Sequence, residues 1–343
     1  MSAVQVFTPE AEDATPFILP RRVLGRTGHA RHQPDGPEAV FELLAEGHDE
    51  GIPGALVTVT SVTGGSARGI GAQMAVLSDG RHAGFLSGGC IEPAIAVEAL
   101  RVISTGLDEE LRIGAGSPFM DLRLPCGGSM LLHLHARPDA QLIYRALDLI
   151  ARREPFDMLF DARSGTVSLT NAADKAVPRA PGDAYWRRFE PRIRLLLVGR
   201  GPELETIAQI APLSGFDVVA TSTDPESLAR LSTSGITVTP LVSPSANLQP
   251  HIDAFTAVVF LFHDHDYEIP LIANALKAEP IYLGALGSRR THERRKERLR
   301  AFGLDEAMIS RIRGPVGLFG PTRDAAGLAL SVLADVAQVR LGG

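Results

Sequence analysis

The sequence is poor in cysteine, in aromatic side chains and in long apolar runs. Two of its 343 residues are Cys, one is Trp, and aromatic residues make up 6%. Two cysteines cannot build the disulfide framework of a small secreted domain, and their scarcity suits a reducing compartment. The longest strongly apolar run, residues 257–262, is far shorter than the roughly 20 residues of a membrane-spanning helix. We therefore expect a cytoplasmic protein without a membrane segment.

An excess of positive charge is also absent. The chain has 34 Lys and Arg against 40 Asp and Glu, which leaves a formal net charge of −6 and argues against general nucleic-acid binding. Residues 1–36 hold few apolar positions and lack the basic start and apolar stretch of a signal peptide. We expect a flexible N-terminal extension there, followed by enough chain for two domains with separate cores.

Residues 37–190 are predicted to form the first domain, a mainly antiparallel β domain with helices, closed by a linker. Pro37 at a first turn and Gly47 at the end bound one expected helix, and residues 92–105 form a second. Asp79-Gly80 is a strong hairpin signal. Apolar or β-branched runs between turn signals predict strands at 55–60, 73–78, 82–87, 120–124 and 129–135.

Both cysteines stand beside paired glycines. Cys90 follows Gly88-Gly89 just before the expected helix 92–105, and a helix N-terminus lowers the pKa of a thiol. Cys126 is followed by Gly127-Gly128. Two interpretations of these turns stay open: small buried residues at tight turns, as most free cysteines are, or soft ligands in a binding site.

Two further features of the first domain have a plain and a functional interpretation. The glycine-rich segment 61–71 could cradle an anion with its backbone N–H groups, assisted by Arg68. Taken alone, the segment is better explained as a flexible connection. His133 and His135 share one face of a strand. They could bind a metal, but we interpret them as a half-exposed polar face.

Residues 191–343 alternate strand and helix patterns, which predicts a Rossmann-like, doubly wound parallel sheet. The buried strand 193–198 leads into Gly199 and Gly201, a nucleotide-like turn whose following helix would offer its N-terminus to a phosphate. The third glycine of the dinucleotide fingerprint is replaced by Leu204, and Glu203 adds negative charge beside the turn. These two residues argue against NAD(P) binding.

Later turns of the second domain also carry polar side chains. Residues 263–266, His-Asp-His-Asp, follow an expected strand; we interpret them as a ligand-contacting loop rather than a metal site. Ser288 is expected to cap a basic helix. Arg289 and Arg290 fall in its first turn, where cations oppose the helix dipole, and this predicts an anion site. The rest of the basic helix is expected on the surface, and residues 325–340 form the closing helix.

In chain order, the segments GGSARGIGAQM, SGGCIE, YLGALGSRRT and GPVGL resemble the XdhC/CoxI family, the xanthine dehydrogenase accessory proteins. The resemblance covers roughly residues 37–340. It implies a protein that binds molybdenum cofactor, as molybdopterin or a dinucleotide form, and accompanies its sulfuration. It also implies delivery to an apo-form molybdenum hydroxylase, with a cysteine desulfurase as the sulfur source. A homodimer and the identity of the molybdoenzyme stay open.

The family's two motifs, Ser-Gly-Gly-Cys and Cys-Gly-Gly, match residues 87–90 and 126–128. Thiolates suit a soft metal centre. A non-enzymatic chaperone is favoured over the alternative, an NAD(P)-dependent oxidoreductase with Cys90 as a catalytic thiol, because the dinucleotide fingerprint is incomplete. The candidate cofactor-binding residues are Arg68, Gly88, Gly89, Cys90, Glu92, Cys126, Gly127, Gly128, Ser288, Arg289 and Arg290.

Overall fold

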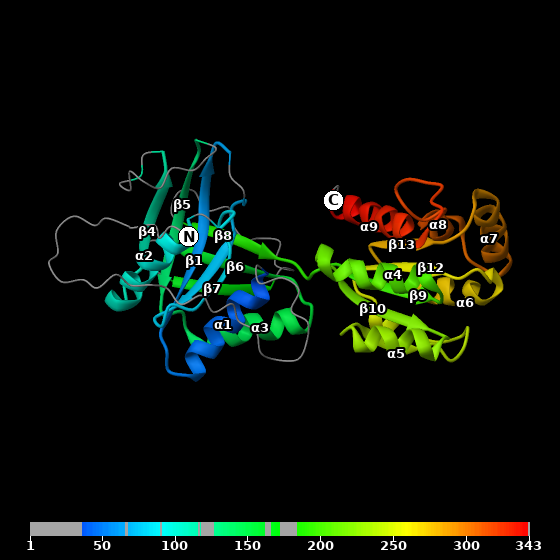
Figure 1. Ribbon diagram of the computed structural model, residues 1–343, viewed down its shortest axis with the longest axis horizontal. Helices are drawn as coiled ribbons and strands as arrows, with labels where there is room; N and C mark the ends of the chain where they lie inside the picture. The colour runs from blue at the N-terminus through cyan, green and yellow to red at the C-terminus, as the bar shows by residue number, and fades with distance from the viewer. Residues whose placement is uncertain are drawn as a thin grey trace, which may run out of the picture. The chain divides into compact units, whose positions relative to one another are not determined.

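The computed structural model describes residues 36–341, except 66–67, 90, 116, 118–126, 162–165 and 172–183. The chain divides into two compact units, whose described parts are residues 36–189 and 190–341 (Figure 1). Cys90, Cys126 and the predicted strand at 120–124 lie outside the described residues. Within those residues, no helix is both long and apolar enough to cross a bilayer.

The N-terminal unit is built on an antiparallel five-stranded sheet of order β3-β2-β1-β5-β4, which confirms the predicted class. Strand β4 was not predicted from the sequence, because charged residues interrupt the apolar pattern of its segment EELRIG, which holds two apolar side chains. The strands are β1 (Gly54–Thr63), β2 (Gln73–Leu77), β3 (His82–Gly84), β4 (Glu109–Gly114) and β5 (Ser129–Ala136).

Three helices cover the two faces of this sheet. Helix α2 (Glu92–Thr105) packs its apolar stripe on one face, with Ile95 and Val102 fully buried against β1 and β5. Helices α1 (Pro37–Asp49) and α3 (Ala140–Ala151) share a separate core on the other face. Burial on both sides explains why β2 is apolar at most positions rather than alternating.

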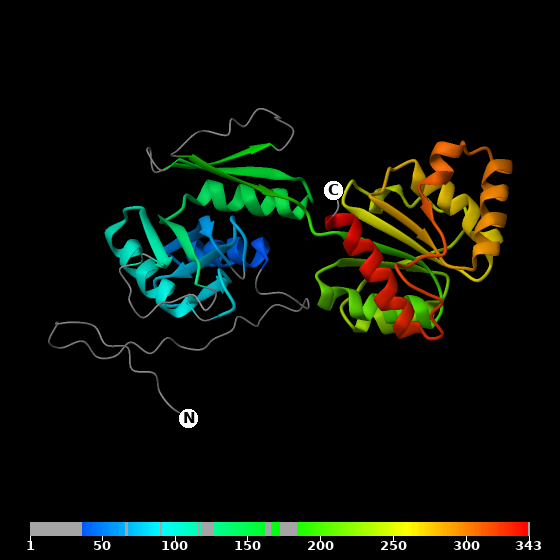
Figure 2. The same cartoon turned by 90° about the horizontal axis from the view of Figure 1, so that it is seen from above.

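Residues 156–189 add a second, three-stranded antiparallel sheet of order β7-β6-β8 to this unit. Its strands are β6 (Phe156–Asp161), β7 (Thr166–Asn171) and β8 (Ala184–Phe189), and α3 lies along the sheet (Figure 2). Phe156, Met158 and Phe160 alternate along β6 and enter the core shared with α1 and α3. This period of two turns one face of β6 toward the core.

The C-terminal unit has a parallel six-stranded sheet of order β11-β10-β9-β12-β13-β14, which confirms the Rossmann-like prediction. The strands are β9 (Arg194–Gly199), β10 (Asp217–Ser222), β11 (Thr237–Pro240), β12 (Thr256–Leu261), β13 (Tyr282–Ala285) and β14 (Ile312–Arg313). The α-helices are α4 (Pro202–Ile210), α5 (Pro225–Thr233), α6 (His265–Leu276), α7 (Arg289–Ala301), α8 (Glu306–Ser310) and α9 (Ala325–Leu341).

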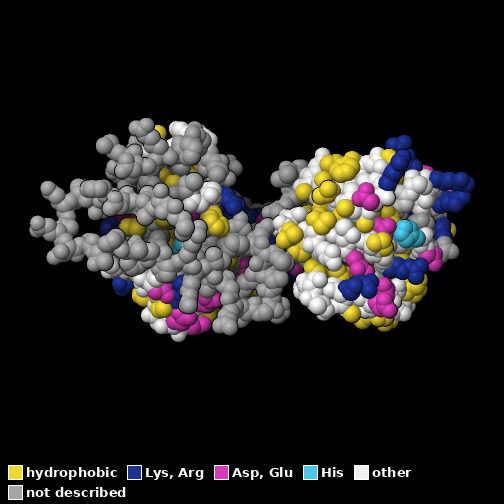
Figure 3. Space-filling view, in the orientation of Figure 1, with side chains coloured by type: hydrophobic (Ala, Val, Ile, Leu, Met, Phe, Trp, Pro, Cys, Tyr) yellow, Lys and Arg dark blue, Asp and Glu magenta, His cyan; other side chains and the backbone are white. Residues whose placement is uncertain are grey.

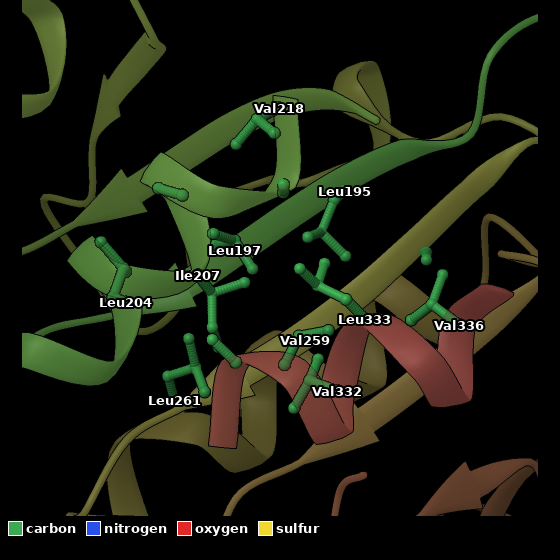
Figure 4. Close-up of a cluster of buried hydrophobic side chains, with 14 of the residues drawn as sticks. Leu195, Leu197, Leu204, Ile207, Val218, Val259, Leu261, Val332, Leu333 and Val336 are labelled. Carbon is green, nitrogen blue, oxygen red and sulfur yellow. The ribbon is translucent and has the colours of Figure 1, made fainter. Parts of the chain in front are cut away.

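Helices pack on both faces of this parallel sheet, as its nearly continuous apolar strands require. Side chains of α4 and α9, among them Leu204 and Val332, converge on Leu197 and Val259 of the sheet (Figure 4). Leu204 is therefore a core residue. Its side chain fills space that the third glycine of a dinucleotide fingerprint leaves open for close helix–strand packing.

The basic helix α7 corrects one expectation, because it is not entirely a surface helix. Lys and Arg side chains gather over it in the space-filling view (Figure 3). Arg295, however, is fully buried and pairs with Glu268 of α6, with a distance of 2.6 Å between Nε and Oε1. The sequence did not distinguish Arg295 from the other basic residues of α7. Its burial depends on the packing of this helix face on α6.

Candidate functional site

The topology of the N-terminal unit brings its predicted site segments to one edge of the five-stranded sheet. Neighbouring strands are antiparallel, so β1, β3 and β4 end at the edge where β2 and β5 begin. The segments 64–72, 85–91 and 115–128 all leave the sheet there. This edge carries the family's two glycine motifs and the glycine-rich loop, although both cysteines themselves lie outside the described residues.

The glycine-rich loop and the Cys-Gly-Gly motif are in direct backbone contact. A Cβ atom on Gly128 would lie 2.6 Å from the carbonyl oxygens of Thr63 and Gly65. A Cβ atom on Gly64, whose φ is +79°, would lie 3.1 Å from the Cα atom of Gly128. Only glycine tolerates such an approach. Two segments that the sequence analysis treated separately therefore form one structural feature.

Glu92 holds the turn that precedes Cys90. Its side chain is buried, and its Oε1 atom accepts hydrogen bonds from the backbone N–H groups of Leu86 at 3.0 Å and Ser87 at 2.7 Å. The Ser87 hydroxyl donates to Oε2 at 2.9 Å. Gly88 and Gly89 are exposed, and the φ of +97° at Gly89 favours glycine. The buried carboxylate of Glu92 thus holds the loop through its hydrogen bonds. The predicted contact of Glu92 with a cofactor stays a prediction.

A pocket of about 250 Å³ adjoins this edge. The buried Gln73 donates through its amide nitrogen to Thr58 Oγ1 at 3.1 Å, and within the described part of the chain its Oε1 atom has no hydrogen-bond partner. Two arginine side chains from distant segments line the cavity together with apolar groups, a combination that suits a ligand bearing an anion. Its lining residues include Arg68, Ile70, Gln73, Phe85 and Arg187.

Arg68 was predicted from the sequence as a site residue, whereas Arg187 was not. Arg187 lies on β8, more than a hundred positions along the chain, and donates to the carbonyl oxygen of Gly71 in the glycine-rich loop. Its guanidinium carbon also lies 4.3 Å from the centre of the Phe189 ring, a cation–π arrangement. No local motif marks Arg187, because only the packing of the second sheet brings it to the pocket.

The strand order of the C-terminal sheet reverses between β9 and β12, and the carboxyl ends of these two strands are where ligands bind in such sheets. Gly199 permits contact with β12, since a Cβ atom there would lie 2.6 Å from the carbonyl oxygen of Leu261. Gly201 has a φ of +94°, and Glu203 Oε2 would lie 3.3 Å from a Cβ atom on it. The same oxygen lies 3.8 Å from His263 Nε2. A carboxylate therefore lies beside the turn that leads into α4.

We expect NAD(P)H to bind poorly because Glu203 repels a pyrophosphate at this turn. A dissociation constant weaker than about 100 µM is expected, and Glu203→Gln should tighten it by about 3- to 10-fold, the effect of removing one like charge at partial exposure. Fluorescence titration with NADH and NADPH measures both values. A low-micromolar constant for the unmodified protein would contradict this prediction and favour an oxidoreductase.

Ser288 caps α7 as predicted, accepting a hydrogen bond from the backbone N–H of Thr291 at 3.2 Å. Arg289 and Arg290 are exposed in the first turn, and among the described residues neither forms an ion pair. Their predicted anion binding stays a prediction.

The interpretation of His133 and His135 as a half-exposed polar face is wrong for His133. His133 is only 6% exposed, because the second sheet covers this part of β5 and the Phe160 ring meets the imidazole edge-on. Both histidines approach the carboxylate of Asp108, a residue that the sequence analysis did not connect with them.

Comparison with known proteins covers most of the chain. Residues 195–336 match the XdhC Rossmann domain, and residues 48–114 match the XdhC and CoxI family. A protein of Escherichia coli K12 called molybdenum cofactor insertion chaperone PaoD is 38% identical over 307 residues, with 90% of each chain covered.

Two more distant relatives are also similar along most of their length. A protein of Bacillus subtilis 168, named as a probable xanthine dehydrogenase subunit, is 26% identical, covering 88% of this chain and 96% of the relative. A crystal structure from Bacillus halodurans, described as a xanthine dehydrogenase, superposes with a TM-score of 0.71 at 21% identity, with 88% and 96% coverage, which shows a shared fold. By its two domain matches and its similarity to the E. coli protein over 90% of both chains, the chain belongs to the XdhC and CoxI family.

Proposed function

We propose that this protein is a chaperone that binds molybdenum cofactor as cargo and inserts it into an apo-form molybdenum hydroxylase of the xanthine dehydrogenase type. The observation that carries the proposal is the 38% identity, over 90% of both chains, to a protein named as a molybdenum cofactor insertion chaperone. The likeness to a probable xanthine dehydrogenase subunit supports the class of recipient.

The loop edge of the N-terminal unit is the proposed cargo site. Its pocket is lined by the amide side chain of Gln73, which we assign to the pterin ring, and by the cationic side chains of Arg68 and Arg187, which we assign to the phosphate. Cys90 and Cys126 belong to loops that leave the sheet at this same edge. Their soft thiolates match the molybdenum–dithiolene end of the cargo.

The finer steps of the pathway follow from the same proposal. The chain holds the cofactor while a cysteine desulfurase supplies the sulfur for its terminal sulfido form, and then passes the cofactor to the hydroxylase in the cytoplasm. Molybdopterin and its dinucleotide form share the phosphate that the arginines would bind. Comparing the retention of the two forms decides between them, and sedimentation of the loaded protein shows whether it works as a homodimer.

The test is reconstitution of an apo-hydroxylase with molybdenum cofactor, with and without this protein. We expect hydroxylase activity to rise in its presence. The Cys90→Ser variant should retain at least about 10-fold less molybdenum, because loss of a ligand or its support costs 10- to 100-fold in affinity. Cys126→Ser should lose less. Molybdenum content by mass spectrometry, together with thermal unfolding as a folding control, gives the comparison.

Three outcomes would count against the proposal. Reconstitution that is equally efficient without the protein would remove the chaperone role. Full molybdenum retention by Cys90→Ser, with slow alkylation of both thiols, would make the cysteines structural. Tight NAD(P)H binding would favour the oxidoreductase instead.

A further inference from the structure

Asp108, His133 and His135 form a cluster at the end of the five-stranded sheet opposite the glycine loops. The Asp108 Oδ2 atom lies 3.2 Å from His133 Nε2 and 2.7 Å from His135 Nδ1. One potential ligand atom from each residue lies within 4.8 Å of the others. Three side chains from two segments thus direct their donor atoms at one point.

The sheet register explains this convergence. His133 and His135 lie on one face of β5, and His133 is paired with Glu110 of β4. Asp108 lies two residues before Glu110, so continuing the antiparallel register places it opposite His135 on the same face. The register of the two strands therefore brings both histidines of β5 together with the aspartate that precedes β4.

The surroundings of the cluster fix the orientation of each group. The backbone N–H of Ala136 donates to Asp108 Oδ1 at 2.8 Å, which leaves Oδ2 directed at both imidazoles. Phe160 contacts the edge of the His133 ring, with ring centres 5.9 Å apart. These contacts hold the Asp108 carboxylate and the His133 ring in fixed orientations.

We propose that Asp108, His133 and His135 bind a divalent transition-metal ion of the zinc class. Two imidazole nitrogens and one carboxylate oxygen form a donor set that suits Zn²⁺ and disfavours Mg²⁺ and Ca²⁺, which prefer oxygen ligands. Three protein ligands leave coordination positions that water can fill. The Ala136 contact supplies the outer hydrogen bond that typically orients a ligating carboxylate.

This site is separate from the proposed cargo site. His133 lies four residues along β5 from Ser129, a distance of about 13 Å at the usual rise per residue, and the glycine loops begin beyond Ser129. The ion would join β5, which carries the two histidines, to the connection between α2 and β4, which carries Asp108. The proposal is therefore independent of cofactor delivery and can fail or succeed separately from it.

The test uses Zn²⁺ alone and the full chain carrying Cys90→Ser and Cys126→Ser, so that thiolates do not compete for the ion. After chelation and dialysis, this parent should bind one Zn²⁺ per chain and unfold at a higher temperature when Zn²⁺ is present. Adding Asp108→Asn or His135→Gln should weaken binding by about 10-fold or more. The matched control is His263→Gln, which removes an exposed histidine of the other unit and should leave binding unchanged.

The visible spectrum of the Co²⁺-substituted parent provides a second measurement, since it reports nitrogen and oxygen coordination directly. If Asp108→Asn fails to fold, Zn²⁺ binding by the His135→Gln variant decides the question, because His135 is partly exposed and its substitution should be tolerated. Absence of Zn²⁺ binding by the parent, or equal binding by His135→Gln, would overturn the proposal and leave a cluster held by hydrogen bonds alone.

Discussion

Replacing Arg295 with alanine is expected to destabilise the C-terminal unit by about 3–5 kcal/mol, because it leaves the buried carboxylate of Glu268 without its cation. Both side chains are 0% exposed. The Arg295 guanidinium also donates to the carbonyl oxygen of Leu286 at 2.5 Å, next to the turn that begins α7. Burial and the Arg295 charge lower the pKa of His292, so the neutral imidazole can accept a hydrogen bond from Arg295.

Hydrogen exchange followed by mass spectrometry measures this effect in the full chain, whose two units need not unfold together. The most protected amides of β12 and β13 should exchange roughly 100-fold faster or more in Arg295→Ala, as a loss of about 3 kcal/mol implies. The matched control is Arg294→Ala, the exposed neighbour on α7, which should change stability by less than about 0.5 kcal/mol.

A double variant separates the stranded charge from the lost packing. Glu268→Leu combined with Arg295→Met removes both charges and keeps apolar volume, so it should recover most of the stability. Unchanged amide protection in Arg295→Ala would show that the ion pair contributes little to the stability of the C-terminal unit and that other groups compensate the Glu268 charge.

Replacing Glu92 with alanine is expected to disorganise the Ser-Gly-Gly-Cys turn and to abolish most cofactor retention. The substitution removes the acceptor for two backbone N–H groups, those of Leu86 and Ser87, and Leu86 is fully buried. A buried donor left without a partner costs about 1–3 kcal/mol, so the N-terminal unit should lose roughly 3 kcal/mol in total. If the proposed function holds, molybdenum retention should fall more than about 10-fold. Mutating a residue that orients a metal ligand typically lowers metal affinity by about 10- to 100-fold, and Glu92 orients the loop that carries Cys90.

Glu92→Gln is the matched variant, because its carbonyl oxygen can still accept from both backbone groups. We expect it to keep retention within about 3-fold of the unmodified protein, the effect of weakening one hydrogen bond. Exchange of the Leu86 and Ser87 amides reports the turn itself and does not depend on any cargo. Slow exchange and full retention in Glu92→Ala would show that other contacts hold this loop.

The fold was predictable where sequence pattern and burial agree. The run 194–199 is apolar at nearly every position, and the parallel strand β9 has helices on both faces. Helix α2 begins at Glu92 and ends at Thr105, as the pattern indicated, and Gly106 follows with a φ of 71°. Strand β4 escaped notice because its pattern is short and rich in charge, and its pairing with β5 depends on residues far along the chain.

The candidate site was predictable in its motifs but not in its geometry. The sequence showed the glycines at 88–89 and 127–128 and the cation Arg68. Paired glycines in a loop indicate close backbone approach or positive φ, and an arginine among them indicates anion binding. Arg187 carried no local signal. Glu92 was visible only as part of a motif, and its role in holding the turn depends on backbone groups of the preceding loop.

The sequence by itself determined the two domain classes, most helices and strands, the glycine motifs and the family resemblance, because each follows from residues close together in the chain. The tertiary structure alone decided which side chains meet. It buried Arg295 against Glu268, placed Asp108 beside His133, and brought Arg187 to the glycine-rich loop. The physical reason is that strand register and helix packing set these distances, and both depend on contacts between segments that no local pattern records.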